Sequence, residues 1–383
     1  MRGSFLMCVT VLFVFASVAV GGAPSFQGLG SLPGGGEEST AYGVSPDGSV
    51  VLGDSLSSFG KEAFRWTESG GIEGLGDLPG GDFKSRAGDA SLNGTVVVGT
   101  SYISETSKEG FYWTATDGIQ GVGDLAGGDY RSGMSAVSAD GTILAGSASA
   151  TSNGEAVRWT EAGGFEQLGF LSGGTWSQTF DMSSDGAVVV GQANHVLTSQ
   201  DEGFRWTQET GMVALGDLDG GDIWSIAYGV SADGAVAVGR SESASGLETF
   251  RWTLTDPSTG AGTMVGLGDL PGGDFEGNAL DVSGDGTVVV GWGTSSLGQE
   301  AFLWDPVHGM RNLKSVLVND CGLDLTGWTL TAAMGVSDDG LTIVGYGTNG
   351  EVSQEAWRAV LPEPASLALL ALGGFALLRK RRS

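Results

Sequence analysis

The sequence of 383 residues contains only two histidines and two cysteines. His195 and His308 both lie in loop-like stretches, and Cys8 falls within an apolar N-terminal run, so Cys321 is the one cysteine in the body of the chain. A metal site of the histidine/cysteine type needs a cluster of such ligands, and these numbers exclude it. An intrachain disulfide in the body is excluded for the same reason.

Basic residues are also scarce. There are 18 lysines and arginines against 45 acidic residues, and Arg2 together with the cluster 379–382 accounts for five of the 18, leaving 13 in the body. So acidic a chain disfavours nucleic acids and anionic membrane surfaces as partners. The body also lacks the 3.6-residue apolar period of helices. What it has instead is 69 glycines and 11 tryptophans, a composition typical of short strands joined by tight turns.

A repeat runs through the body. An Asp-Gly or Asn-Gly pair is followed by a tryptophan after an interval that ranges from 18 residues (Asp339 to Trp357) to 21 (Asp185 to Trp206). Self-similarity at this period indicates a propeller or another repeat array. The seven pairs are Asp47-Gly48, Asn93-Gly94, Asp140-Gly141, Asp185-Gly186, Asp233-Gly234, Asp285-Gly286 and Asp339-Gly340, and their tryptophans are Trp66, Trp113, Trp159, Trp206, Trp252, Trp304 and Trp357.

Each repeat predicts four short strands. Apolar runs such as 136–138 and 142–146 flank the Asp-Gly pair, which predicts a hairpin with a type I′ turn. The third strand carries an aromatic pair, as in Phe64 and Trp66, whose spacing places both on one face. The second strands contain consecutive valines, for example at 188–190, which indicates burial on both faces.

Small four-stranded sheets stacked face to face form either a closed β-propeller or an open β-array. The body begins at 26–32 with a fourth-type strand and ends at 357–360 with a third-type strand. Pairing the two would complete the last blade and leave no exposed sheet at either end of the stack. We therefore predict an all-β fold, a seven-bladed β-propeller of four-stranded blades closed by an N-terminal strand, with the open array as the alternative.

The repeats resemble the HAF-type bacterial extracellular repeat. The resemblance lies in Leu-Gly-Asp-Leu-Pro-Gly-Gly at 75–81, Val-Ser-Ala-Asp-Gly at 230–234 and Phe-Arg-Trp at 204–206, and it extends over about residues 24–360. The resemblance implies an extracellular location. It implies no settled biochemical activity.

Both ends of the chain differ from the body. Residues 1–23 combine Arg2, an apolar run and small residues, the layout of a secretory signal peptide; a retained N-terminal anchor is the alternative. Residues 362–383 contain Pro362, Glu363 and Pro364, an apolar stretch at 365–378 and a basic cluster. This tail resembles the PEP-CTERM sorting signal, which implies a Gram-negative source, a short transmembrane segment, and processing by an exosortase-type enzyme. The body, 24–361, would then lie outside the cell.

The tryptophans suggest two roles. One tryptophan per repeat at a fixed position is what packing between blades requires. Trp176 and Trp224 fall outside that register and follow Gly-Gly turns, so we predict them as ligand contacts, with sugar stacking as the chemistry. The arginines that precede the tryptophan in four repeats predict cation–π or hydrogen-bonded links between blades; they are Arg65, Arg158, Arg205 and Arg251.

Aspartates after Gly-Gly pairs form the candidate cation sites. They are Asp82, Asp129, Asp222 and Asp274, and calcium is the ion that such carboxylates and loop carbonyls would bind. Aspartate is also favoured in turns because it hydrogen-bonds its own backbone, and the spacing matches no known calcium loop. Turn chemistry is therefore the competing interpretation.

No catalytic set can be named from the sequence, because the two histidines lack a triad context and the acidic residues occupy repeated positions. We expect a cell-surface binding module or scaffold for extracellular polysaccharide or surface proteins. The alternative is a hydrolase of extracellular polymers that uses acidic residues in the propeller channel. Acidic side chains protruding into the channel would favour the enzyme, and small residues there would favour the scaffold.

Overall fold

The structure, a computed structural model, describes residues 23–128, 130–149, 153–195, 200–350 and 352–363. The chain divides into two compact units, of which Pro24–Leu361 is one. Most of the predicted signal peptide, the apolar segment 365–378 and Pro364 lie outside the described residues. Within the described part, no helix is both long and apolar enough to cross a membrane.

Residues Pro24–Leu361 form four-stranded antiparallel sheets, as the repeat pattern predicts. Each repeat contributes its strands in chain order. The first four repeats form β2 (Gly34–Val44), β3 (Val50–Ser57), β4 (Lys61–Thr67), β5 (Gly71–Gly76), β6 (Ser85–Ala90), β7 (Val96–Tyr102), β8 (Lys108–Thr114), β9 (Gly118–Gly121), β10 (Gly133–Val137), β11 (Leu144–Ser149), β12 (Gly154–Thr160), β13 (Gly164–Gln167), β14 (Ser177–Met182), β15 (Val188–His195), β16 (Gln200–Thr207) and β17 (Gly211–Ala214).

The later repeats follow the same order. Two of their sheets are joined by one parallel pair, Leu247 with Glu276. The strands are β18 (Gly220–Val230), β19 (Val236–Ser243), β20 (Gly246–Asp256), β21 (Ala261–Gly266), β22 (Gly272–Val282), β23 (Val289–Ser295), β24 (Gly298–Asp305), β25 (Gly309–Asn312), β26 (Thr329–Val336), β27 (Thr342–Thr348) and β28 (Glu355–Val360), with β1 (Ser25–Gly28) at the beginning of the chain.

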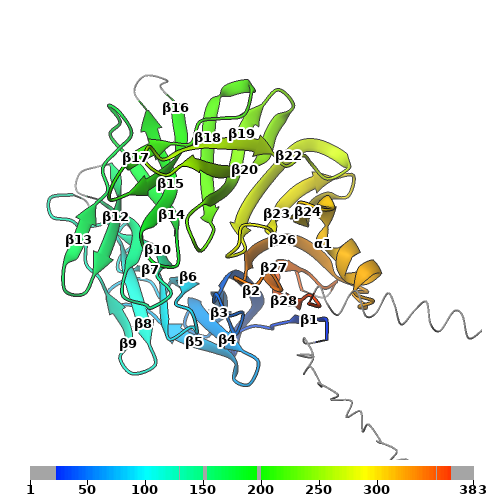
Figure 1. Cartoon of the computed structure of the whole chain (residues 1–383). Helices are drawn as coiled ribbons and strands as arrows, with labels where there is room; N and C mark the ends of the chain where they lie inside the picture. The colour runs from blue at the N-terminus through cyan, green and yellow to red at the C-terminus, as the bar shows by residue number, and fades with distance from the viewer. Residues whose placement is uncertain (1–22, 129, 150–152, 196–199, 351, 364–383) are drawn as a thin grey trace, which may run out of the picture. The chain divides into compact units, whose positions relative to one another are not determined.

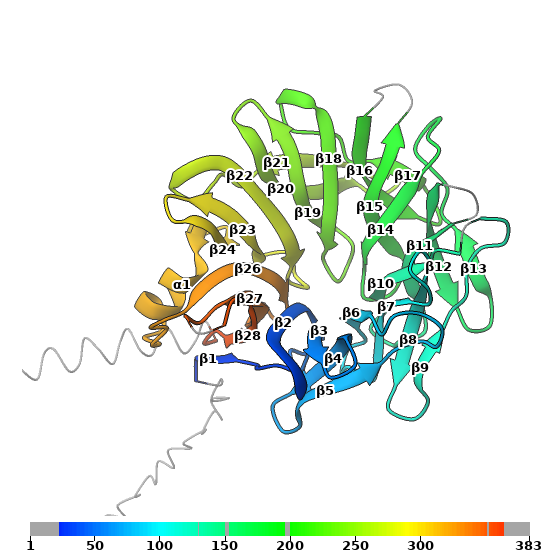
Figure 2. The same cartoon turned by 180° about the vertical axis from the view of Figure 1, so that it is seen from behind.

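The sheets of Pro24–Leu361 are arranged around a centre as the blades of a β-propeller, with the first strand of each repeat innermost (Figure 1). The N-terminal strand β1 pairs with β28, as the sequence predicts, with Ser25 opposite Val360 and Gly28 opposite Trp357. The two strands lie side by side in both views (Figures 1 and 2). Two segments more than 300 residues apart therefore share one sheet.

The Asp-Gly turns differ from the predicted type I′ geometry. The amide of Gly48 donates to the carbonyl of Ser45 at 2.8 Å, so the central residues of this turn are Pro46 and Asp47. Proline cannot take the positive φ that a type I′ turn needs at its first central position. Positive φ falls instead on Gly48, at 73°, after the turn. The prediction of a hairpin is right, and the predicted turn type is wrong.

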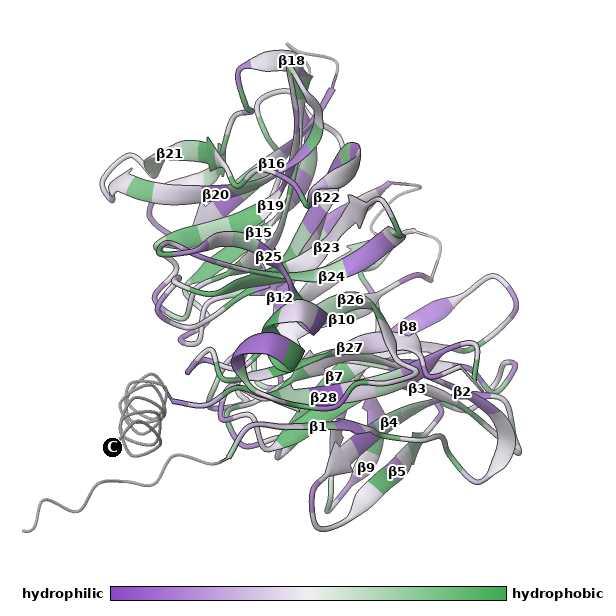
Figure 3. Cartoon of the chain, turned by 90° about the vertical axis from the view of Figure 1, so that its right-hand side faces the viewer, coloured by the Kyte–Doolittle hydropathy of each residue, from purple (hydrophilic) through white to green (hydrophobic). Residues whose placement is uncertain are grey.

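The core lies between neighbouring sheets. Val189 and Val190 on β15 are both fully buried although they point to opposite faces of the strand, which confirms the prediction from the consecutive valines. Figure 3 shows hydrophobic stretches along such middle strands, for example β15 and β19. Trp66 and Trp252 are buried in the core as predicted.

One repeat departs from the predicted tryptophan register. Trp357 pairs with Gly345, as Phe64 pairs with Gly53 in the first repeat. It therefore stands at the phenylalanine position, and Ala359 stands where other repeats have tryptophan. Trp357 is fully buried and contacts the ring of Phe26 on β1, at 6.1 Å between centroids.

The predicted arginine links are confirmed. Nη1 of Arg158 donates to the carbonyl of Gly186 in the next sheet at 2.9 Å, and its guanidinium lies 4.6 Å from the centre of the Trp206 ring. Nε of Arg205 donates to the carbonyl of Gly234 in the same way, at 3.0 Å. These bonds connect the third strand of one blade to the hairpin turn of the next.

The loop after β25 contains the described helical turns, α1 (Leu313–Ser315) and the π-helical η1 (Val316–Asp320). They replace the Leu-Pro-Gly-Gly turn of other repeats. Leu313 and Leu317 are fully buried in the core of the last sheet. We did not expect helix in the body, because turns of three and five residues are too short to show a helical period.

Candidate functional site

Every innermost strand carries a β-bulge at the same place. In β2 the pairing with β3 skips Tyr42, which lies between the paired residues Ala41 and Gly43. A bulge re-aims a side chain out of the regular alternation of the strand. The bulge residues of the successive sheets are Tyr42, Gly88, Ser135, Phe180, Tyr228, Leu280 and Met334.

All of these bulge residues line one cavity of about 770 Å³. Five of them are large, whereas Gly88 and Ser135 are small. The cavity also reaches outward to residues of the second, third and fourth repeats, such as Thr100, Ser147 and Gln178. Small-molecule sites typically measure roughly 300–1,000 Å³, so this one has room for a short oligosaccharide.

Aromatic side chains form much of the wall of this cavity. Phe180 and Tyr228 contact each other, with ring centroids 4.9 Å apart, and Tyr42, Tyr102 and Trp176 complete the set. Trp176, a predicted ligand contact, therefore does line a cavity. Its backbone amide donates to Oδ1 of Asn194 at 2.9 Å, which fixes the chain where the tryptophan enters β14.

The same cavity is lined by three cations, Arg86, Lys108 and Arg131. The guanidinium of Arg86 lies 3.5 Å from the centre of the Tyr42 ring, a cation–π contact between the first two sheets. No aspartate or glutamate occurs among the described residues that line the cavity. In a chain with a formal charge of −27, this local excess of positive charge is unexpected.

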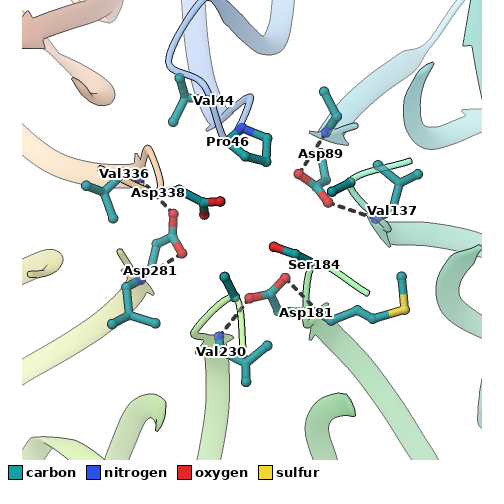
Figure 4. Close-up of a pocket in the computed structure, with 15 residues that line it drawn as sticks. Val44, Pro46, Asp89, Val137, Asp181, Ser184, Val230, Asp281, Val336 and Asp338 are labelled. Carbon is teal, nitrogen blue, oxygen red and sulfur yellow. Dashed lines mark hydrogen bonds between the residues drawn. The ribbon is translucent and has the colours of Figure 1, made fainter. Parts of the chain in front are cut away.

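A second and smaller cavity, of about 70 Å³, occupies the central channel (Figure 4). It is lined by the residues that follow each bulge and by the hairpin turns. Asp89, Asp181 and Asp281 come from alternate sheets, and Asp338 joins them from a turn. In the equivalent position of the remaining sheets, the chain has only small residues, namely Gly43, Ala136, Gly229 and Gly335.

Each of the three strand aspartates links two sheets. One carboxylate oxygen of Asp89 accepts the amide of Ala90 at 2.7 Å, and the other accepts the amide of Val137 in the next sheet at 2.8 Å. Asp181 binds Val230 in the same way at 2.7 Å. The third, Asp281, binds Val336 at 2.7 Å, and these links are drawn in Figure 4. The aspartates thus satisfy backbone donors between blades.

Burial and mutual repulsion hold these carboxyls partly in the neutral form. Loss of hydration, followed by the charge of Asp181, raises the pKa of Asp89 from 3.8 to about 8. Loss of hydration raises the pKa of Asp181 to about 7, against the effect of its two backbone donors. The pKa of Asp281 is raised well above its ordinary value for the same reason.

Steric crowding explains why glycine occupies positions near the channel. A Cβ atom added at Gly43 would lie 2.3 Å from the carbonyl oxygen of Gly88, and one at Gly335 would lie 3.3 Å from the Cα atom of Gly43. The innermost strands therefore approach each other too closely for a side chain at every position. Alternation of aspartate and small residues satisfies both packing and hydrogen bonding.

The other predicted site residues are not brought together. Trp224 lies half-buried on β18 beneath the guanidinium of Arg240, 5.1 Å from its ring centre, and does not line the cavity. Asp82 is exposed in a loop, Asp222 and Asp274 are exposed near the beginning of β18 and β22, and Asp129 lies outside the described residues. Among the residues that the structure describes, no group of three or more potential ligands could hold a metal ion.

The bulge residues and the channel aspartates were not predicted as site residues. Both sit at fixed offsets in the repeat, three and two residues before the serine of the Val-Ser-x-Asp-Gly motif. That serine is Ser91 in the second repeat, so the offsets give Gly88 and Asp89. Aligning the repeats would reveal a variable position next to one that is either acidic or small, between positions that hardly change.

Comparison with known proteins yields the fold alone. No family model and no curated protein matches the chain. Similar solved structures include a prolyl endopeptidase (TM-score 0.54, 13% identity, 85% of this chain and 50% of that one). Two others are TolB from Acinetobacter baumannii (TM-score 0.44, 13% identity, 68% of this chain and 62% of that one) and the Dos1 propeller (TM-score 0.46, 11% identity, 88% and 94%). The match thus spans less than two thirds of the length of TolB, and it spans half of the length of the endopeptidase.

Proposed function

We propose that residues 24–361 form a closed propeller of seven blades. The junction between the last and first repeats supports this, because it uses the same hydrogen bond as the interior junctions. The amide of Ala356 donates to Oγ of Ser39 at 3.0 Å, as the amide of Ala63 donates to Oγ of Ser85 at 2.9 Å. An open array would have no reason to repeat an interior contact at its two ends.

A circuit of backbone hydrogen bonds also supports closure. In each repeat after the first, the residue before the aspartate or asparagine of the hairpin turn donates its amide to the carbonyl of its counterpart in the next repeat. The last of these bonds runs from the amide of Asp338 to the carbonyl of Pro46, at 2.9 Å. Proline has no amide hydrogen, so Asp47 donates in its place to Leu92, at 3.2 Å. The full circuit runs through Leu92, Ala139, Ser184, Ala232, Gly284, Asp338 and back to Pro46.

For this propeller we propose a non-catalytic binding function, with extracellular polysaccharide as the ligand class. The single observation that supports it is the 770 Å³ cavity with its aromatic wall. Flat aromatic side chains suit the apolar faces of sugar rings, and Trp176 and Tyr102 are large, only partly buried members of that wall. Cavities that combine apolar walls with a few polar groups are the usual form of a ligand site.

The alternative, a hydrolase that uses the channel acids, has one observation in its favour. Four aspartates do enter the channel, as that hypothesis requires. However, a cavity of about 70 Å³ holds a few water molecules and no sugar ring. Both carboxylate oxygens of each strand aspartate also accept hydrogen bonds from backbone amides, in Asp89, Asp181 and Asp281. These facts favour a structural role for the channel acids.

The location of the protein is a proposal of the same kind. We propose export and retention at the cell surface, with an exosortase-type enzyme acting at Pro362, Glu363 and the following proline, on the basis of the sequence resemblances alone. Surface proteins are the second partner class. Calcium at the predicted aspartates has no structural support, because Asp82, Asp222 and Asp274 each lie apart from other carboxylate ligands among the described residues.

A glycan array with purified residues 24–361, in the presence and absence of calcium, tests the proposed function. This segment contains all the described strands and core clusters. We expect binding to one group of polysaccharides that Trp176→Ala weakens about tenfold, since loss of one stacked aromatic ring costs about 1 kcal/mol or somewhat more. Trp224→Ala, outside the cavity, is the matched control and should bind normally. Failure to bind any polysaccharide would refute the proposal.

A further inference from the structure

The cations of this chain are unevenly distributed. Only 13 basic residues lie between residues 24 and 361, yet three of them line the cavity. A fourth, Lys84, lies over the ring of Tyr102, which lines it as well, with Nζ 4.2 Å from the ring centre. About a third of the positive charge of the propeller is therefore gathered around one site, in a molecule that is acidic elsewhere.

The three lining cations come from two neighbouring sheets. Arg86 lies on β6 beside the ring of Tyr42. Lys108 begins β8, and an isolated bridge pairs it with Arg131 at the entrance to the third repeat. The backbone thus places Lys108 and Arg131 on adjacent segments at the edge of the cavity, where one anionic group could contact both.

Within the described residues, none of these three cations forms an ion pair, although the carboxylate of Asp54 interacts with the charge of Arg86. Elsewhere in the molecule, arginines such as Arg65 and Arg311 are paired with carboxylates. Among the described residues of the loop before Arg131, the acidic one is Asp124, whose carboxylate accepts the backbone amides of Arg131 and Ser149. Guanidinium Nε of Arg131 donates to a carbonyl oxygen, which orients the group without neutralising it.

We propose that the ligand of this cavity is an anionic polysaccharide, whose acidic groups contact Arg86, Lys108 and Arg131 while its sugar rings stack on the aromatic wall. This proposal rests on the proposed function and specifies its ligand class. Arginine binds a carboxylate or sulfate through two parallel hydrogen bonds, and lysine adds a point charge. The shared chemistry is an anionic group on a sugar; the carboxylate and sulfate forms are two sources of it.

Isothermal titration calorimetry with defined probes tests the charge requirement. The probes are an oligogalacturonate, its carboxyl-reduced neutral counterpart of equal length, and a sulfated dextran oligomer, each added to residues 24–361 at low and high salt. We expect the oligogalacturonate or the sulfated oligomer, or both, to bind at least tenfold more tightly than the neutral oligomer. Raising the salt should weaken that binding, because contacts with exposed cations are screened.

Charge-removing variants then locate the binding. Arg86→Gln and the double variant Lys108→Gln/Arg131→Gln should each weaken binding of the anionic probe by about three- to thirtyfold, as expected for loss of charge-assisted contacts. Arg311→Gln removes the same charge from a partly buried ion pair on β25, outside the cavity lining, and should leave the affinity unchanged. Circular dichroism confirms that each variant is folded.

Three results would overturn the inference, and each is distinct. Equal binding of the neutral oligomer, lost in Trp176→Ala, would keep the proposed function and refute the charge requirement. Anionic binding that Arg311→Gln weakens as much as Arg86→Gln would indicate a non-specific effect of net charge. If the protein binds no oligosaccharide at all, charged or neutral, the proposed function itself is refuted.

Discussion

The cavity and the channel are built from neighbouring residues of the same strands, yet their polar groups are in opposite states. In the channel, Asp89, Asp181 and Asp281 each accept two backbone amides, so the protein itself provides their partners. In the cavity, Arg86 and Lys108 belong to a wall that contains no aspartate or glutamate among the described residues. Buried polar groups with internal partners stabilise a fold, whereas charged side chains that line an open cavity are available to a ligand.

The difference arises from the bulge. It allows two successive residues of one strand to face the axis region, one toward the cavity and the next toward the channel. The first position can vary freely because it faces open space, as Gly88 and Tyr228 show. The second is constrained to aspartate or a small residue, because it meets the next sheet. One repeated element therefore yields both the links between neighbouring sheets and a site with its own shape.

The largest effect is expected from filling the cavity. Gly88→Tyr would place in the second repeat the side chain that the first and fifth repeats carry at the bulge. A Cβ atom at Gly88 would meet its nearest neighbour, the carbonyl of Ser135, at 3.7 Å, so the fold should tolerate it. We expect binding of the oligosaccharide to fall at least about a hundredfold with little change in thermal stability.

Calorimetric titration and thermal unfolding of the same samples measure both quantities. Ser135→Ala, which leaves the space open, is the control and should bind as the unchanged chain does. Unaltered affinity in Gly88→Tyr would mean that the ligand binds elsewhere.

A smaller effect, on stability alone, is expected in the channel. Asp181→Ala leaves the amides of Met182 and Val230 without their acceptor. The free energy of unfolding should fall by about 1–3 kcal/mol, the usual cost of an unsatisfied buried group, while binding remains. Urea unfolding at pH 6 measures it, with the exposed Asp82→Ala as a control that should change stability by less than about 0.5 kcal/mol. Equal stability of the two variants would show that water replaces the carboxylate.

Stability should also depend on pH, with a definite sign. The pKa of Asp89 is about 8 in the folded protein against an ordinary 3.8, so the folded state holds its proton more tightly. The stabilisation is complete below about pH 4 and is lost as the pH rises toward 8. Stability should therefore decline across this range, and Asp89→Asn should flatten the decline.

The turn aspartates have the opposite effect on the free energy of unfolding, and they have it at lower pH. Hydrogen bonds from Ser138 and Thr142 lower the pKa of Asp140, so its contribution is lost only when the pH falls below the ordinary value. Thermal unfolding between pH 3 and 9 should therefore show a maximum under mildly acidic conditions. A maximum above pH 8 would contradict the assignment of the channel carboxyls.

Much of the fold could be predicted from the sequence, because its signals are local. The Asp-Gly pairs mark the hairpins, the consecutive valines mark strands buried on both faces, and the arginine before Trp159 or Trp206 marks a link between blades. The partner of β1 could be predicted because an extra fourth-type strand precedes the first repeat and the last repeat lacks one. Trp357 was assigned to the wrong register because its repeat substitutes alanine at the tryptophan position, which only strand pairing reveals.

The site was harder to predict. Trp176 was found because it stands outside the repeat, but Trp224 stands outside it too and packs under Arg240 instead of lining the cavity. A bulge is a property of two paired strands, so no local pattern identified Tyr42 or Phe180 as cavity residues. The channel aspartates were hidden because an acidic residue that occurs in only three of the seven repeats is lost when the repeats are read as copies of one consensus.

The contrast between channel and cavity can be measured directly by hydrogen exchange on residues 24–361, with and without an oligogalacturonate. We predict slow exchange at the amides of Val137, Val230 and Val336 in both samples, because the aspartates already bind them. We predict slowing upon addition of ligand around Arg86–Gly88 and Arg131–Ser135. Fast exchange at the three valines, or protection by ligand at the channel instead of the cavity, would contradict the account.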